Sequence, residues 1–226
     1  MATDVYSLAS PTRTAVLFVE CQRGVIGAGG VLPALTEAAC PVLPALARLA
    51  DGARAAGALV VHLLYVPAAG NRSSNRKPPL FGHVLRQMSD WTADHPATQV
   101  VDEIGTLPDD LVFPRHSGLS PTHATETFHV LRNIGITTAV VAGGSANIAI
   151  PVVATEAADE GFDVVIARDA IYGTPAEHTA SMLRHTLAFI ATITTVDELL
   201  AALAAAEPSA TQPAENGADE HPLALR

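Results

Sequence analysis

The sequence has few basic residues and few cysteines, and each shortage excludes a class of protein. Lys and Arg number 13 against 23 Asp and Glu, which gives a formal net charge of −10 at pH 7. Because a protein that binds nucleic-acid phosphates needs clustered Lys and Arg, we expect no nucleic-acid partner. The two cysteines, Cys21 and Cys40, cannot form a disulfide framework, so we expect a cytoplasmic location.

Long apolar runs are missing as well. No stretch approaches the ~20 residues that span a bilayer. The first residues, MATDVYSLASPTRT, lack the basic region and apolar core of a signal peptide. We therefore expect neither secretion nor a membrane partner.

Hydrophobic residues, by contrast, are abundant. They make up 49% of the 226 residues, which is enough for one sizeable core. We assign residues 13–205 to a single domain and residues 1–12 to an N-terminal extension. Residues 206–226 are dominated by Pro, Ala, Glu, Asn and Gly, a composition that predicts a disordered C-terminal tail.

Buried strands alternate with amphipathic helices through the domain. The predicted strands cover residues 15–19, 57–66, 111–118, 137–144 and 161–171, followed by a short strand in TITTVDELLAAL. The predicted helices cover residues 35–56, 122–136, 146–160 and 175–191, with a closing helix in TITTVDELLAAL. Pro41 and Pro44 disturb the first helix, and Thr122 is a candidate cap for the second. This alternation predicts an α/β fold of three layers, αβα, with a central parallel sheet.

Three polar or glycine-rich segments follow directly after predicted strands. Glu20 comes after the first strand, Arg115 lies at the third, and Gly143–Gly144 closes the fourth. Ligands of parallel α/β sheets bind beyond the carboxyl ends of the strands. We therefore expect these segments to converge on one pocket.

The order of several motifs resembles the isochorismatase-like hydrolases, also called the cysteine hydrolase superfamily. The resemblance covers roughly residues 12–200. It rests on VECQ at 19–22, LRNIGITTAVVAGG at 131–144, SANIAI at 145–150 and GFDVVIARDA at 161–170. It implies the Rossmann-like fold of that family, a small-molecule substrate, a homo-oligomer (dimer or tetramer) and a cis peptide near Gly144–Ser145–Ala146.

All three members of the family's usual catalytic triad are replaced here. The position of the nucleophilic Cys falls on Ala149, and the acid that activates the thiol is Glu20 in place of Asp. The family Lys falls at Arg115 or His116. Ala149 has no nucleophilic atom, so the covalent route of the amidase members is closed at that position. Cys21 is adjacent to Glu20 and should face the other way, which favours a buried hydrophobic role.

The replaced residues still suit acid–base chemistry. We predict that Glu20 is the general acid/base of the reaction. The alternative interpretation is a structural role, in which Glu20 forms a salt bridge or caps a helix. Arg115 suits a two-point clamp on a substrate carboxylate. His116 could exchange protons near neutral pH. The alternative interpretation is that His116 is an ordinary surface residue.

The turn that leads into the third predicted helix, residues 146–160, is the predicted substrate-binding segment. Backbone amides at a helix N-terminus stabilise an anion. The predicted binding residues are Gly144, Ser145, Ala146, Asn147 and Ala149. Asn147 either projects into the pocket or caps the helix, and Asp169 is interpreted as capping the turn before Gly173.

We expect neither a metal nor a cofactor. The nine histidines are scattered without metal-ligand spacing, and His62 lies inside a predicted strand with no partner following it.

Three functions remain open from the sequence. The first is a Cys-independent hydrolase of a small carboxylate-bearing substrate, which cleaves a vinyl ether or a C–N bond. The second is a catalytically inactive small-molecule-binding protein on the same scaffold. The third is an amidohydrolase with Ser117 or Ser145 as its nucleophile.

Overall fold

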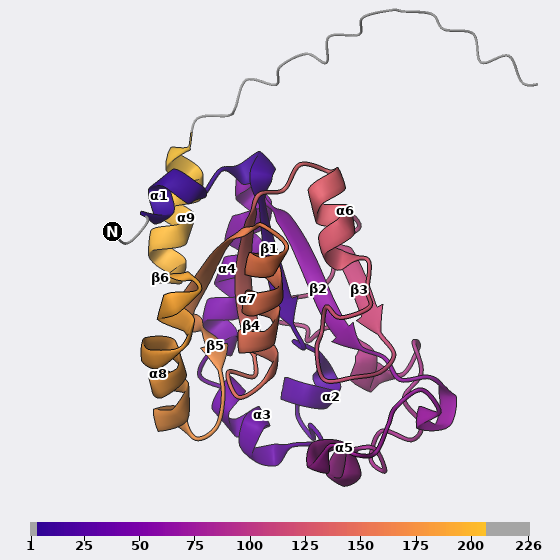
Figure 1. The fold of residues 1–226 in the computed structure, drawn as a ribbon. Coiled ribbons are helices and arrows are strands. Elements are labelled where there is room, and N and C mark those ends of the chain that lie inside the picture. Colours follow the sequence, from indigo (N-terminus) through magenta and orange to yellow (C-terminus); the bar gives the residue numbers. More distant parts are fainter. Residues whose placement is uncertain (1–3, 207–226) are drawn as a thin grey trace, which may run out of the picture.

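The computed structural model describes residues 4–206. It contains one six-stranded parallel sheet in the order β3-β2-β1-β4-β5-β6 (Figure 1). The strands are β1 (Thr14–Val19), β2 (Leu59–Tyr65), β3 (Leu111–Arg115), β4 (Thr138–Gly144), β5 (Asp163–Tyr172) and β6 (Thr192–Thr194). The predicted parallel α/β fold is confirmed. The predicted disordered tail lies outside the described residues, apart from Ala206.

The central strand β1 explains why the sheet is covered on both faces. All six residues of β1 are buried, and the strand is paired with β2 on one side and β4 on the other. Val16 and Phe18 belong to one hydrophobic core, whereas Ala15, Leu17 and Val19 belong to the other. Successive side chains of a strand point to opposite faces, so a continuous apolar run fits a sheet between two helical layers.

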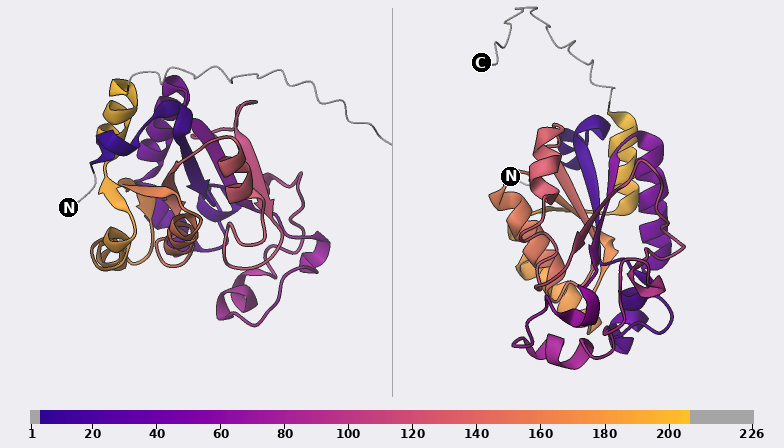
Figure 2. Two further views of the ribbon diagram at one scale, coloured as in Figure 1. Left: turned by 45° about the horizontal axis from the view of Figure 1, so that its top comes forward. Right: turned by 90° about the vertical axis from the view of Figure 1, so that its right-hand side faces the viewer.

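The longer helices form the two outer layers, which the right-hand view of Figure 2 separates. The helix bounds are α1 (Val5–Leu8), α2 (Arg23–Ile26), α3 (Pro33–Ala39), α4 (Leu43–Ala56), α5 (Pro79–Val84), α6 (Thr127–Asn133), α7 (Ala149–Asp159), α8 (Ala176–His185) and α9 (Val196–Ala205). The short helices α2, α3 and α5 lie at one end of the sheet (Figure 1). Helices α4 and α9 pack on one face, and α6 and α7 pack on the other. Within residues 4–206, no helix combines the length and apolar character needed to cross a membrane.

Two predicted helices differ from the structure. The helix predicted over residues 35–56 is two helices, α3 and α4, because Pro41 has no N–H to continue the first and Pro44 fits the first turn of the second. The predicted cap Thr122 is wrong, since α6 begins only at Thr127. The Thr122 hydroxyl instead donates to the carboxylate of Glu156 on α7.

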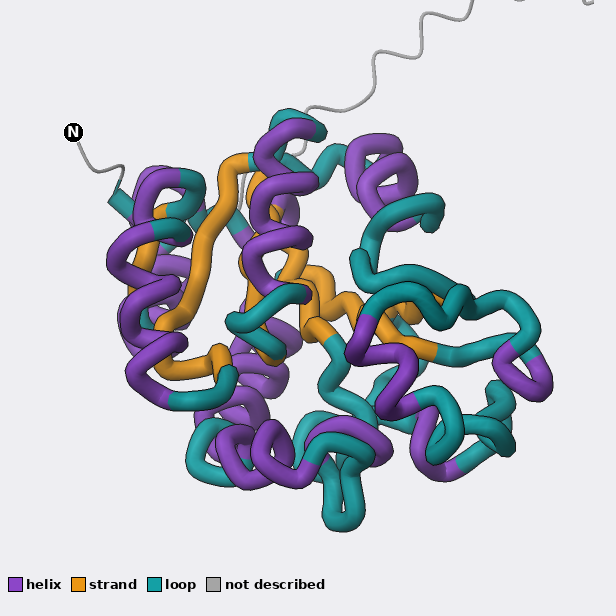
Figure 3. Tube along the Cα trace, turned by 60° about the horizontal axis from the view of Figure 1, so that its bottom comes forward, coloured by secondary structure: helices purple, strands orange, loops and turns teal. Residues whose placement is uncertain are grey.

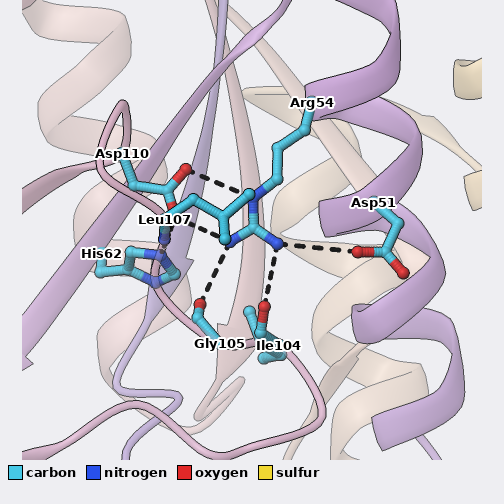
Figure 4. A network of polar contacts seen from close by, with 7 residues as sticks. All are labelled: Asp51, Arg54, His62, Ile104, Gly105, Leu107 and Asp110. Atoms are coloured by element: carbon cyan, nitrogen blue, oxygen red, sulfur yellow. Dashed lines mark hydrogen bonds and ion pairs between the residues drawn. The ribbon is translucent and has the colours of Figure 1, made fainter.

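A buried polar network joins α4 to the start of β3 (Figure 4). Arg54 donates to Asp110 through Nη2 at 2.7 Å and Nε at 3.3 Å, and it also binds the carbonyls of Ile104 and Gly105. Nε2 of His62, inside β2, lies 3.1 Å from Oδ2 of the same Asp110. Because Asp110 directly precedes β3, the network lies toward the amino ends of the strands.

Candidate active site

The candidate site lies where the strand order reverses. In the order β3-β2-β1-β4-β5-β6, the chain runs outward in one direction from β1 and in the other from β4. A parallel sheet opens a crevice beyond the carboxyl ends of its strands at such a point. Val19 and Gly143 are register partners at the ends of β1 and β4, so Glu20 and Gly144 emerge side by side. Figure 3 looks toward this end of the sheet, where loops and short helices cover it.

The backbone around Glu20 is unusual and tightly fixed. Glu20 has φ 52°, in the left-handed region that few non-glycine residues adopt. Its amide donates to the carbonyl of Leu63 at 2.9 Å. The neighbouring Gly143 has φ 97°, and a Cβ there would lie 2.4 Å from the carbonyl oxygen of Val19. Only glycine permits this close approach, which sets the position of Glu20.

Cys21 lies behind this contact and is fully buried. Burial raises the pKa of its thiol strongly, and the carboxylate of Glu20 raises it further. The thiolate, rather than the thiol, is the nucleophile of cysteine chemistry. Cys21 is therefore a core residue, as its position next to Glu20 predicts.

Glu20 and Arg115 form an ion pair inside the protein. Nη2 of Arg115 donates to Oε1 of Glu20, and the two side chains are only 6% (Arg115) and 16% (Glu20) exposed. The guanidinium lies over the ring of Tyr65, 4.8 Å from its centroid, and Nε donates to the carbonyl of Gly118 at 3.3 Å. Arg115 is therefore held in place by three partners, Glu20, Tyr65 and Gly118.

Two of the five N–H groups of Arg115 are already bound within the protein. A fork of two parallel N–H groups needs Nη2 together with Nε or Nη1, and both Nη2 and Nε have partners within the protein. Nη1 is buried and has no hydrogen-bond partner among the described residues. The two N–H groups of Nη1 and the second N–H of Nη2 therefore remain, and the clamp on a substrate carboxylate stays a prediction.

Glu20 and Arg115 line a cavity of about 70 Å³, which we call the carboxyl-end cavity. Most of its wall is apolar. Its lining residues are Glu20, Val25, Val31, Leu32, Leu35, Tyr65, Leu80, Phe81, Val84, Met88, Arg115, Leu119, Ser145, Ile148 and Ala149. Cavities for drug-sized ligands occupy about 300–1,000 Å³. The carboxyl-end cavity therefore suits only a small group, held mainly by apolar contacts.

The turn after β4 places some of the predicted binding residues in the cavity and others elsewhere. Ser145 and Ala149 line it, with Ile148 between them. Ala146 is buried, and its amide donates to the carbonyl of Tyr172 at 2.8 Å. The peptide between Gly144 and Ser145 is cis, as the resemblance implied. Gly144 packs under the ring of Tyr172 and is absent from the lining.

Asn147 has neither of the two roles predicted for it. The side chain is exposed, donates to the carbonyl of Thr174 at 2.6 Å and accepts from the amide of Thr174 at 3.0 Å. It therefore fixes the turn against the loop after β5. The sequence separation of 27 residues explains why a local reading missed this contact.

His116 and Ser117 are exposed and lie outside the carboxyl-end cavity. Nδ1 of His116 lies 2.6 Å from the carbonyl oxygen of Val66, so the ring fastens the end of β3 to the loop after β2. Asp169 is structural, but its partner differs from the prediction. Its Oδ1 accepts from the amide of Val196 at 2.9 Å and holds the start of α9 rather than the turn before Gly173.

The sequence reading missed the side chains that close the cavity from outside. Leu80, Phe81, Val84 and Met88 come from α5 and the residues after it. Their spacing places them on one side of a helical turn, a signal that was present in LFGHVLRQM. Among the described residues, no group of three or more His, Cys, Asp or Glu is arranged to hold a metal ion.

Comparison with known proteins identifies the family. The Isochorismatase domain matches residues 14–198. The chain belongs to the isochorismatase family. Among its relatives is the uncharacterized isochorismatase family protein YecD of Escherichia coli, which is 28% identical over 192 residues; the match covers 84% of this chain and 96% of YecD.

Solved structures of isochorismatase-type proteins share the fold. A cysteine hydrolase from Pseudomonas syringae pv. phaseolicola superposes with a TM-score of 0.77 at 22% identity, covering 88% of this chain and 95% of that one. N-carbamoylsarcosine amidase from Thermoplasma acidophilum superposes with a TM-score of 0.64 at 19% identity, covering 82% and 97%. These likenesses establish the shared architecture of the isochorismatase family.

Proposed function

We propose that this isochorismatase-family protein hydrolyses a small carboxylate-bearing substrate without a cysteine nucleophile. Glu20 is the general acid/base of the reaction, and Arg115 positions it. The observation that supports this most directly is the buried Glu20–Arg115 ion pair, which lies in an apolar cavity that Ala149 also lines. A carboxylate held in a cavity of this kind is suited to transfer protons to and from a bound water.

The ion pair between Glu20 and Arg115 favours one of the two bond types. Cleavage of a vinyl ether begins with proton donation, which needs a neutral carboxyl group. In the structure, Glu20 accepts a hydrogen bond from the guanidinium of Arg115 as the carboxylate partner of an ion pair. Hydrolysis of a C–N bond begins instead with removal of a proton from the attacking water, which an ionised Glu20 can perform.

A balanced sequence of steps follows. Glu20 takes a proton from water as the water oxygen bonds to the substrate carbonyl carbon. The carbonyl oxygen becomes an oxyanion, and the amide of Ala149, which has no acceptor among the described residues, is available to it. Glu20 then returns the proton to the leaving nitrogen as the C–N bond breaks.

The test is a panel of small amides, ureides and vinyl ethers, assayed with the wild-type protein, Glu20→Gln and the control Glu37→Gln. Glu37 is an exposed carboxylate on α3, so its loss should leave turnover unchanged. Loss of one general base lowers turnover by about 10²–10⁴-fold. Equal turnover by Glu20→Gln and wild type would exclude Glu20 from the mechanism.

A second candidate function is a catalytically inactive binding protein. The observation in its favour is that Glu20 and Arg115 are paired with each other, as in a structural ion pair. Such a protein would show ligand-induced increases in Tm with no turnover of any panel compound. Its Glu20→Gln variant would lose stability rather than activity.

A serine nucleophile is the third candidate, and the structure separates the two serines. Ser145 lines the carboxyl-end cavity together with Glu20, whereas Ser117 is exposed outside it. Ser145→Ala distinguishes the mechanisms. Abolished turnover would indicate a covalent intermediate on Ser145, and retained turnover would support attack by water.

We also propose a cytoplasmic location and a homo-oligomer of two or four chains. Both rest on the composition and the resemblance to the isochorismatase family. Light scattering coupled to size-exclusion chromatography tests the second proposal directly, because a single mass of 23.4 kDa would contradict it.

A further inference from the structure

The segment that covers the carboxyl-end cavity has an unusual charge. Residues 67–89, which we call the basic cover, contain Arg72, Arg76, Lys77 and Arg86 but no Asp or Glu. The whole chain has a net charge of −10. The basic cover therefore carries a net positive charge in an acidic protein up to the next acidic residue, Asp90, and its apolar side chains line the candidate site.

The basic cover divides its side chains between the cavity and the solvent. Leu80, Phe81, Val84 and Met88 face the cavity and line it. The four cations are exposed. Among residues 4–206, none of the four takes part in an ion pair. Their charge is therefore available to a ligand.

The basic cover is held in a defined position. The hydroxyls of Tyr65 and Ser74 lie 2.5 Å apart, and Nδ2 of Asn71 donates to the carbonyl of Leu85 at 2.6 Å. Phe81 and Met88 belong to a small hydrophobic core with Tyr65. Because Tyr65 also lies under Arg115, the cover is joined directly to the candidate catalytic pair.

The interior of the cavity has no spare positive charge. Arg115 is its only Lys or Arg, and that guanidinium is paired with Glu20. An anionic group placed inside would lose its hydration and would also meet the Glu20 carboxylate, which is a costly combination. The exposed cations of the cover offer an anion a hydrated position instead.

We propose that the basic cover binds the anionic group of the substrate at the mouth of the carboxyl-end cavity, while the apolar or reacting end enters it. The substrate class is thus a small amphiphilic anion with its charge at one end. This inference rests on the proposed function for the location of the site and not for its chemistry. It assigns recognition of the substrate's charge to Arg72, Arg76, Lys77 and Arg86 instead of Arg115.

The experiment measures binding of hexanoate and of its neutral analogue hexanamide by ligand-observed NMR titration. The test variant is Arg76→Gln/Lys77→Gln. The matched control is Arg168→Gln/Arg184→Gln, which removes the same charge from two exposed arginines on β5 and α8. Binding needs no turnover, so failure of the hydrolase proposal and failure of this one give different results.

The wild-type protein should prefer hexanoate over hexanamide by about fivefold in about 0.01 M salt, where screening is weak, and by less than about twofold in about 1 M salt. Arg76→Gln/Lys77→Gln should reduce the low-salt preference to below about twofold, and the control pair should retain it. Equal binding of the two probes, or no binding of hexanoate, would overturn the proposal. A preference that survives in the cover variant but disappears in Arg115→Gln would place the anion inside the cavity and also overturn it.

Discussion

The ring of Tyr172 occupies the space in which a Cβ on Gly144 would lie, because such an atom would be 2.2 Å from two ring carbons. Tyr172 is itself 2% exposed and cannot turn away into solvent. We expect Gly144→Ala to lower the free energy of unfolding by about 2 kcal/mol or more, as overpacked core substitutions do.

Urea unfolding measures this effect, and Gly82→Ala is its control. Gly82 lies in α5, and nothing stands within 4 Å of a Cβ built there. Alanine is a better helix former than glycine, so Gly82→Ala should be neutral or slightly stabilising. Equal stabilities of the two variants would show that the turn adjusts freely to Gly144→Ala.

Asp110 should contribute strongly to stability. Its side chain is 3% exposed and accepts from Arg54, His62 and the amide of Leu107. Removing one partner of a buried ion pair costs about 3–5 kcal/mol. We expect Asp110→Asn to lose stability in that range in chemical denaturation. The exposed neighbour Asp109 provides the control Asp109→Asn, which should change the unfolding free energy by less than about 0.5 kcal/mol.

The same network predicts a loss of stability in acid. Burial lowers the pKa of His62 despite its bond to Asp110, so below about 6.5 the unfolded chain binds a proton that folded His62 resists. For Asp110, burial alone would raise the pKa, but the bonds from Arg54, Leu107 and His62 outweigh it and lower the pKa. That stabilisation is present above about pH 4 and is lost as the pH falls through the lowered value.

The free energy of unfolding should therefore decrease between pH 7 and pH 5 and decrease again below pH 4. His62→Gln should remove most of the first decrease and leave the second. Denaturant titrations at several pH values measure both stages. A wild-type and a His62→Gln curve that run parallel from pH 7 to pH 5 would mean that His62 is protonated equally in both states.

The two cysteines should differ in reactivity. Burial raises the pKa of Cys21, whereas Cys40 is exposed at the end of α3. Iodoacetamide should modify Cys40 alone in the native protein and both residues in urea, as intact-protein mass spectrometry would show. Rapid native labelling of Cys21 would mean that the contact behind Glu20 opens.

Ala149→Cys should create a reactive thiol. Ala149 lines the cavity with Glu20 and is the first residue of α7, where the helix N-terminus favours a thiolate. In a Cys40→Ser background, we expect iodoacetamide to react with this variant about tenfold faster than with Ala180→Cys, on the exposed side of α8. Adding Glu20→Gln should slow the reaction if the carboxylate accepts the thiol proton. Equal rates at positions 149 and 180 would contradict an activating site.

The fold was predictable because its signals are local and repeated. The run AVLFV in β1 is apolar on both faces, which fits only a strand between two layers. The meeting of Glu20 and Arg115 followed from the topology of a parallel sheet, although 95 residues separate them. The positions of Glu20 and Arg115 at the ends of their strands were therefore enough to predict that the two side chains meet.

The rest of the site depends on contacts between residues far apart in the sequence, which no local sequence pattern predicts. The ring of His116 bonds to Val66 outside the cavity, although His116 directly follows Arg115. Asn147 and Thr122 each have a partner more than 25 residues away, Thr174 and Glu156, and those partners decide their roles. Local capping rules applied to such residues give the wrong answer because a tertiary hydrogen bond competes with the cap.

The chain leaves the sheet after β2 and returns only at β3, and the basic cover (residues 67–89) is the part of this connection that lines the cavity. The strands before and after this connection, β2 and β3, are hydrogen-bonded to each other from Val61–Leu111 to Tyr65–Arg115. Replacing the basic cover with another segment would alter which molecules enter the carboxyl-end cavity. The sheet and the backbone of Glu20 would stay as they are. Divergence of this protein toward new substrates can thus proceed by replacing one stretch of chain.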